Sequence, residues 1–323
     1  AAWEAIESVG LTAAATSEAR GGPGADAGDV HALVKLAGAC AVPVPLVETF
    51  LAEQLLAAAG LPALSGPCTV GPVLRCDRLT LSRRNGGWDI SGTLHRIPWA
   101  RHAHSLVVVA QFEGADRTAI LRNIPAIEEG WNYAREPRDT VSLVEFGLTD
   151  DAVGAATSLS AEDLYRRGAL MRVLEMAGAL EVILELTVRY AKERIQFGRP
   201  IGKFQAVQQQ IAALASQVAA ASAAASAAAD CSAAAPAAFE IAAAKARIGE
   251  AVAVATGIAH QVHAAIGFTH EHSLHRSTGR LLSWRDEFGT ETEWAAWVGA
   301  VVARAGGEGL WEYLTQPANL RVV

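Results

Sequence analysis

Apolar residues recur at helical spacing over most of the second half of the chain. One run consists of Leu170, Val173, Leu174, Ala177, Leu180, Ile183, Leu184 and Val188. The same period resumes after a short break, at Val207, Ile211, Leu214 and Val218. This spacing places the apolar side chains on one face of each helix. It predicts helices over about 160–192, 203–232, 236–265 and 289–314, with Ser160 and Asp163 as a capping box. Four long helices with short connections are typical of an antiparallel bundle.

The first sixty residues also read as helices. One begins close to Ala1, and others are expected over 30–40, with Asp29 as N-cap, and over 44–59. Because the chain opens inside a helical phrase, earlier residues are expected to be missing. These features predict an N-terminal helical domain, truncated at its start, over residues 1–62.

The next part of the chain, residues 63–150, reads as short strands between glycines and prolines. Strand composition is clearest over 79–81, 88–90 and 105–110, and Asn85-Gly86 signals a tight turn. The pattern predicts a small antiparallel β domain, followed by the helical bundle over 151–323. The fold class expected is therefore α+β, with helices in the majority.

The composition of the chain limits which kinds of partner and which cellular compartment are expected. The 323 residues are 51% hydrophobic and 19% charged, with a net charge of −7, which argues against a nucleic-acid partner. No purely apolar run reaches the roughly 20 residues that cross a bilayer, so no membrane span is expected. The four cysteines are scattered, which favours reduced thiols in a cytoplasmic protein.

The break in the helical pattern carries the candidate chemistry. Three residues that favour turns lie in it: Gly198, Pro200 and Gly202. It also contains two polar donors, Arg194 and Gln205, and two flat apolar side chains, Phe197 and Phe204. A plain helical hairpin requires only the turn residues. The additional side chains indicate a loop that binds something flat and negatively charged, such as a nucleotide.

The pattern R-x-Q-F-G-x-P-I-x-x-F-Q in this break resembles the signature turn of the acyl-CoA dehydrogenase family. In that family the turn contacts the adenosine and pyrophosphate of an FAD whose flavin ring lies in a neighbouring subunit. The resemblance implies FAD-binding roles for Arg194, Gln196, Phe197, Ile201, Phe204 and Gln205. The family's Q-x-x-G-G-x-G turn appears here with alanines at the middle glycines, which implies the same role for Gln261, Ala265 and Gly267.

The family's catalytic base is missing from both of its usual positions. Members of the family remove an α-proton of an acyl thioester with a glutamate while flavin N5 takes the β-hydride. The commoner position directly precedes a Gly-Thr pair, and here Phe288 precedes Gly289-Thr290. The other position falls on Gly168. No catalytic residue is therefore expected, with Glu287 as a weak alternative.

The motifs that hold the flavin ring in this family are also altered. The zone of T-E-P-x-x-G-S-D begins here with residues 66–72, which read G-P-C-T-V-G-P. The zone of W-I-T-N reads R-I-P-W, so Arg96 replaces the stacking tryptophan and Pro98 replaces the hydrogen-bonding threonine. Proline has no backbone N–H to donate.

This uneven loss implies a non-catalytic subunit that completes the FAD site of a partner chain. The resemblance is to heteromeric acyl-CoA dehydrogenases of actinobacterial sterol side-chain degradation, with two copies of each chain. It implies FAD shared with a catalytic subunit and an acyl-CoA substrate, for which a steroid side-chain thioester is one candidate. Two alternatives remain: a self-sufficient dehydrogenase with an atypical base, and a flavin-free structural or binding member of the fold.

Two charged clusters lie outside these motifs. His270-Glu271-His272 with His275 lacks convincing metal-ligand spacing, so a solvated loop and no metal site are expected. Arg166 and Arg167 are expected on a solvated or interface face, with contact to a CoA phosphate as the alternative.

Overall fold

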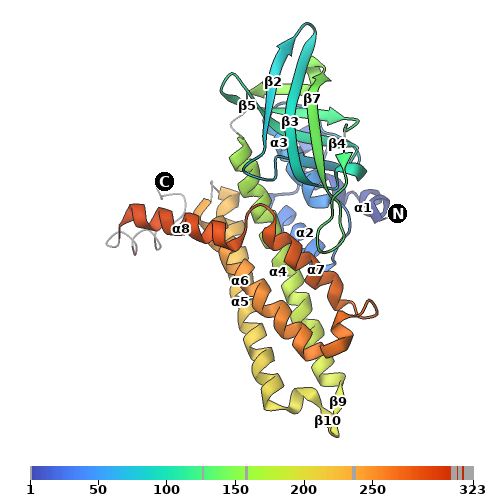
Figure 1. Cartoon of the computed structure of the whole chain (residues 1–323), viewed down its shortest axis with the longest axis vertical. Helices are drawn as coiled ribbons and strands as arrows, with labels where there is room; N and C mark the ends of the chain where they lie inside the picture. The colour runs from blue at the N-terminus through green and yellow to red at the C-terminus, as the bar shows by residue number, and fades with distance from the viewer. Residues whose placement is uncertain are drawn as a thin grey trace. The chain divides into compact units, whose positions relative to one another are not determined.

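The computed structural model describes residues 2–125, 127–156, 159–234, 238–306, 311 and 315 (Figure 1). The chain forms two compact units, one made of residues 1–30 and 43–168, the other of residues 31–42 and 169–323. The domain boundaries expected at residues 62 and 150 stay predictions. The α+β class with a majority of helix is confirmed.

The helical part of the first unit is organised around α3 (Leu46–Ala58). Three leucines of this helix, Leu51, Leu55 and Leu56, are each 1% exposed. Thr49 fastens the helix to the first strand, because its hydroxyl donates to the Pro45 carbonyl at 2.7 Å and accepts the Cys68 N–H at 3.1 Å. The shorter α1 (Ala2–Ser8) precedes it.

The next helix, α2 (Ala27–Ala39), has residues in both units. Asp29 was expected as its N-cap, and that prediction is wrong. The Asp26 carboxylate accepts the Asp29 N–H at 2.8 Å, so Asp26 caps the helix and Asp29 lies in its first turn. Later in α2, Gly38 lies so close to α4 that a Cβ there would meet the Glu175 carbonyl oxygen at 2.1 Å.

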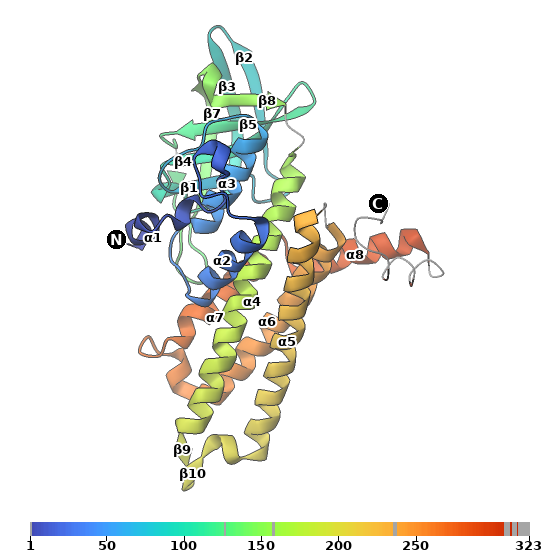
Figure 2. The ribbon, with the colours of Figure 1, turned by 180° about the vertical axis from the view of Figure 1, so that it is seen from behind.

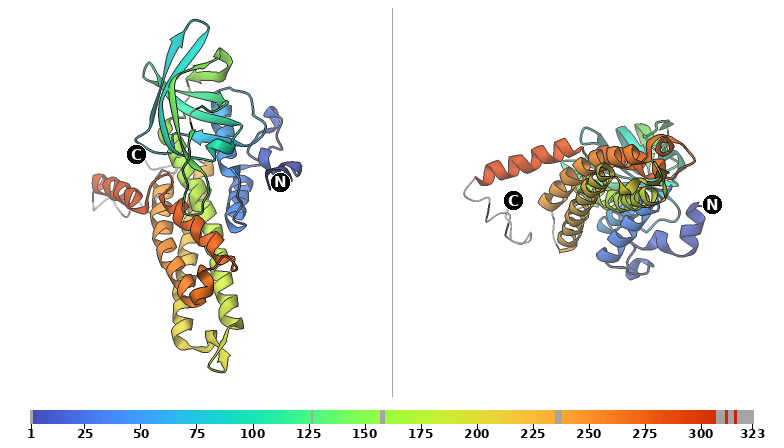
Figure 3. Two further views of the ribbon diagram at one scale, coloured as in Figure 1. Left: turned by 45° about the vertical axis from the view of Figure 1, so that its right-hand side comes forward. Right: turned by 90° about the horizontal axis from the view of Figure 1, so that it is seen from below.

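In the described residues, eight strands of the first unit form one curved, twisted sheet (Figure 3). They are β1 (Cys68–Gly71), β2 (Arg78–Arg84), β3 (Gly87–Pro98), β4 (Ser105–Phe112), β5 (Ala115–Arg122), β6 (Ile127–Glu128), β7 (Arg138–Leu148) and β8 (Val153–Ala156). Their order is β6-β7-β3-β2-β4-β5-β8, with β1 on β4. The β2–β3 hairpin turns at Asn85-Gly86, as predicted. The sheet is antiparallel except where β4 pairs in parallel with β1 and, at one position, with β2.

The second unit is built from long helices: most of α4 (Ala161–Glu193), then α5 (Gln205–Ala234), α6 (Ala238–His263), α7 (Leu274–Asp286) and α8 (Glu291–Ala305). α4, α5 and α6 run alongside one another (Figure 2). The helices predicted over 160–192, 203–232 and 236–265 correspond closely to α4, α5 and α6. The fourth is described from residue 291 to residue 305, and α7 was not predicted.

Capping residues set the helix starts. At α4 the predicted box is present, because the Ser160 hydroxyl accepts the Asp163 N–H at 3.1 Å and the Asp163 carboxylate accepts the Ser160 N–H at 3.0 Å. A second capping box, between Thr290 and Glu293, starts α8. This box stabilises the start of α8 at Thr290, the second residue of the Gly-Thr pair.

Two helical stretches, Gln205–Ser232 and Ala238–Phe268, are long and apolar enough to cross a bilayer by length and composition alone. The sequence pattern gave no such expectation, because serine, glutamine and aspartate interrupt the alanine-rich tract. Core helices of soluble proteins pass the same test, so the finding is weak evidence for a membrane.

Candidate functional site

A short β-hairpin with a two-residue loop follows α4 at one end of the bundle. Its strands, β9 (Ile195–Gln196) and β10 (Arg199–Pro200), are joined by Phe197 and Gly198. Both joining residues have positive φ angles, 52° and 79°, as a type I′ turn requires. A non-glycine residue in this region costs on the order of 1–3 kcal/mol. Phe197 is nevertheless 91% exposed, so packing within this chain does not explain its presence.

Further side chains of the predicted set surround this turn. The Phe204 ring lies edge-on to Phe197, with centroids 6.1 Å apart, and the Arg199 guanidinium lies 4.2 Å from the Phe204 centroid. The Ile201 N–H donates to the Arg194 carbonyl at 2.8 Å, which closes the loop. The remaining polar members of the set, Arg194, Gln196 and Gln205, are all exposed. The loop therefore presents cationic and aromatic groups to its surroundings. Arg199 was missed because the family signature leaves its position open.

An open pocket of about 610 Å³ lies on α6 and the short η6 helix (Ala264–Phe268) that follows. Gln261 and Ala265 line it, as does Gly257, where a Cβ would meet nothing within 4 Å. Ala264, also in the lining, has φ 53°, the conformation that the glycine of the family pattern adopts without strain. Gly267 is buried, and a Cβ there would meet the His263 Cβ at 2.9 Å. The predicted pair Gln261 and Ala265 thus faces a pocket, whereas Gly267 supports its wall.

Aromatic side chains connect the hairpin end of α4 with the pocket end of α6. The Tyr190 ring stacks on His263 with centroids 4.6 Å apart, and His263 contacts His272 at 4.7 Å. Burial holds the pKa of His263 below its usual value. The hairpin and the pocket therefore occupy the same end of the bundle (Figure 1). Within the described residues no group of three or more His, Cys, Asp or Glu side chains is placed to hold a metal ion.

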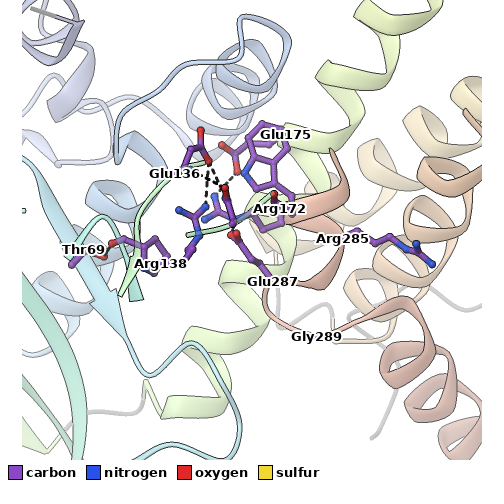
Figure 4. A network of polar contacts seen from close by, with 12 residues as sticks. Thr69, Glu136, Arg138, Arg172, Glu175, Arg285, Glu287 and Gly289 are labelled. Carbon is purple, nitrogen blue, oxygen red and sulfur yellow. Dashed lines mark hydrogen bonds and ion pairs between the residues drawn. The ribbon is translucent and has the colours of Figure 1, made fainter. Parts of the chain in front are cut away.

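The turn between α7 and α8, where the family's base would lie, is closed. Phe288 is 1% exposed with φ 52°, and the Trp294 indole donates to its carbonyl at 2.8 Å. The carboxylate of the preceding Glu287 pairs with the Arg172 Nε at 2.8 Å. Figure 4 shows Arg172 among acidic side chains, and its Nη1 also pairs with Glu175 at 2.6 Å. The nearest carboxylate is thus held in a buried ion network.

Lys245 stabilises the same turn through hydrogen bonds, a role that the sequence analysis did not predict. Its ammonium is fully buried and donates to the carbonyls of Trp284, Arg285 and Gly289 at 3.1, 2.7 and 2.8 Å. Burial lowers its pKa to about 7, against the opposing charge of nearby carboxylates such as Glu287. The signal in the sequence was a single lysine inside an alanine-rich apolar run.

In the first unit, the positions that hold a flavin ring in the resembling family do not suit one here. The Thr69 hydroxyl is fully buried and donates to the Pro98 carbonyl, so it is not available to a ligand. Pro98 is itself buried and has no N–H. Arg96 is exposed with φ 57° and lacks the aromatic ring of the tryptophan that it replaces.

Comparison with known proteins relates this arrangement to one family. Residues 161–291 match the model described as acyl-CoA dehydrogenase, C-terminal domain. The acyl-CoA dehydrogenase IpdE2 of Mycolicibacterium smegmatis is 30% identical over 228 residues, which cover 68% of this chain and 63% of the relative. IpdE2 of Mycobacterium tuberculosis is 33% identical over 229 residues, with 68% and 62% covered. The aligned part thus spans less than two thirds of these relatives.

Solved structures share the fold. The ChsE4-ChsE5 complex of Mycobacterium tuberculosis contains a chain with TM-score 0.87 and 23% identity, covering 94% of this chain and 88% of that one. The butyryl-CoA dehydrogenase of Megasphaera elsdenii has a TM-score of 0.80 and 18% sequence identity, and the match covers 93% of this chain and 89% of that one. At these identities the similarity establishes the fold alone.

Proposed function

Because the chain has the acyl-CoA dehydrogenase fold and residues 161–291 are a C-terminal domain of that family, we propose that it is a subunit of an FAD-dependent acyl-CoA dehydrogenase. In this proposal the chain lacks its own base and completes the FAD site of a catalytic partner. One observation carries it: the position before Gly289-Thr290 holds Phe288, 1% exposed, and the adjacent Glu287 is paired with Arg172.

The residues at the hairpin end suit the tail of FAD. Arg194 and Arg199 provide guanidinium groups, which match pyrophosphate oxygens in a forked geometry. Phe197 and Phe204 provide apolar ring faces for an adenosine, and Gln261 an amide at the rim of the neighbouring pocket. When bound, FAD supplies the hydride acceptor of the desaturation. This chain's own contribution is to hold and orient the tail, since the position of the base holds Phe288 and the adjacent Glu287 carboxylate is paired with Arg172.

The partner and the substrate are proposed from chemistry and from related proteins. A site with a tail-binding half and no base requires a second chain with the missing half. One structural neighbour is a complex of two different chains, ChsE4 and ChsE5, and another is described as a steroid acyl-CoA dehydrogenase, Tcur3481-Tcur3483. We therefore propose a heterotetramer with two copies of each chain, located in the cytoplasm, that acts on a bulky acyl-CoA such as a steroid side-chain thioester.

Flavin spectra of the chain with and without its partner test the proposal. The chain is purified alone and after co-expression with the product of a neighbouring reading frame of the same family. The proposal predicts no flavin absorption and no acyl-CoA oxidation for the chain alone, and both for the complex. Substantial dehydrogenase activity of the chain alone would reject it in favour of a self-sufficient enzyme.

A further inference from the structure

Two arginines converge on an open pocket in the first unit that the proposed function does not use. The pocket has a volume of about 370 Å³. The polar residues of its lining are Ser17, Arg20, Glu53, Gln54 and Arg167, and the apolar ones are Ala15, Ala57, Ala58 and Leu159. Arg20 ends the short η2 helix (Glu18–Arg20), Gln54 lies on α3 and Arg167 on α4, so residues far apart in the sequence meet here.

Arg20 is held by two partners but retains one unpaired nitrogen. Its Nε pairs with the Glu53 carboxylate at 2.6 Å, and its Nη1 donates to the Leu61 carbonyl at 2.8 Å. Its Nη2 is buried and has no hydrogen-bond partner within the described part of the chain. A buried donor without an acceptor is costly, so an acceptor group that reached this nitrogen from the pocket that Arg20 lines would gain a hydrogen bond.

Arg167 reaches the pocket with a neutral partner. Its Nη1 donates to the Gln54 amide oxygen at 2.7 Å. Arg167 is exposed as a whole, but partial desolvation of its guanidinium lowers its pKa, and the negative charge of Asp163 opposes this shift. Glu53 is already paired with Arg20, so the polar wall carries two guanidinium groups and one carboxylate, a net positive charge.

We propose that this pocket binds the phosphate group of a small molecule whose apolar part lies against the alanine-lined wall. Guanidinium N–H groups form charge-assisted hydrogen bonds with phosphate oxygens. Ser17 supplies a third donor, because it precedes the short η2 helix (Glu18–Arg20) and makes no side-chain capping bond. The proposal is independent of the hairpin and of FAD.

Titration of the full chain with inorganic phosphate at constant ionic strength, followed by ³¹P NMR line width and thermal shift, tests the site. Arg167→Gln should weaken phosphate binding about tenfold, as expected for the loss of a charge-assisted contact. Arg20→Lys keeps a cation beside Glu53 but removes the unpaired Nη2, and should weaken phosphate binding as well. Arg166→Gln is the matched control, because this neighbour on α4 pairs with Glu162 and does not line the pocket; it should bind phosphate like the wild type.

Three outcomes would overturn the proposal. The first is the absence of saturable phosphate binding in the wild type. The second is equal weakening by Arg166→Gln and Arg167→Gln, which would show only a general electrostatic effect. The third is acetate binding as tightly as phosphate, which would reassign the pocket to carboxylates. If Arg20→Lys does not fold, the comparison of Arg166→Gln with Arg167→Gln decides alone.

Discussion

The hairpin between α4 and α5 and the turn between α7 and α8 differ in whether their strained and polar residues are exposed or buried. At the hairpin end, Phe197 keeps a strained backbone while 91% exposed, and Arg194 and Gln205 face outward. At the α7–α8 turn, Phe288 has a similar φ angle but is buried, and Glu287 is ion-paired. Strain at an exposed position indicates a ligand or partner outside the chain. Strain at a buried position is held by the packing around it.

The largest expected effect concerns the buried ion network. Arg172→Ala removes the guanidinium that pairs with the carboxylates of Glu175 and Glu287, and should lower the free energy of unfolding by about 3–5 kcal/mol. Urea denaturation measures the loss. The control is Lys35→Ala, whose exposed pair with Glu181 should contribute at most about 1 kcal/mol. Equal losses in both variants would show that the turn is not closed by this network.

Lys245 provides a pH-dependent test of the same turn. Its folded pKa of about 7 lies well below the ordinary lysine value, so between those values the unfolded chain binds more protons than the folded chain. Stability should therefore rise with pH above about 7, and this contribution should be lost as the pH falls back toward 7. Lys245→Met should remove that slope and lower stability by about 2–3 kcal/mol, because three carbonyls lose their hydrogen-bond donor. Urea denaturation of the wild type and of Lys245→Met at pH 7.5 and 9.5 measures the change of stability with pH. The same change in both proteins would show that Lys245 does not cause it.

At the open end, the expected effect is on FAD and not on folding. Arg194→Gln should weaken FAD retention by the complex about tenfold, because one charge-assisted contact to pyrophosphate is lost. Arg189→Gln, an exposed position one turn earlier on α4, should leave FAD retention unchanged. Flavin fluorescence during dialysis measures the difference. Unchanged flavin content in Arg194→Gln would favour the flavin-free alternative.

The smallest expected change in stability concerns Phe197, the residue with a strained backbone in the hairpin. Phe197→Gly removes the strain of the positive φ angle and should leave stability unchanged or raise it by up to about 1 kcal/mol. The same change removes the exposed ring and should reduce FAD retention. Thermal unfolding and flavin release measured on the same sample give both values. A clear loss of stability would show that Phe197 is a folding residue of the hairpin.

Sequence reasoning recovered the parts of this molecule that depend on local pattern. Apolar periodicity identified α4, α5 and α6, and the Ser160–Asp163 box was visible as residue types at fixed spacing. The phenylalanine before Gly289 was visible in the same way, and the lack of a catalytic base that it implies stays a prediction. α7 was missed because a histidine-rich turn precedes it and no long apolar run marks it.

Long-range contacts could not be derived in this way. Arg172 and Glu287 are 115 residues apart, and nothing local pairs them. The same holds for Lys245, whose three acceptors are backbone carbonyls that any residue supplies. The residues proposed to bind FAD remain predictions, since their exposure is compatible with that role but does not assign it.

The most direct test of the account is the FAD content per chain of the purified complex. Each pair of unlike chains should hold one FAD that acyl-CoA reduces, because this chain supplies only the tail-binding half of a site. One FAD for every chain, with the lone chain also binding and reducing its own flavin, would contradict the central claim.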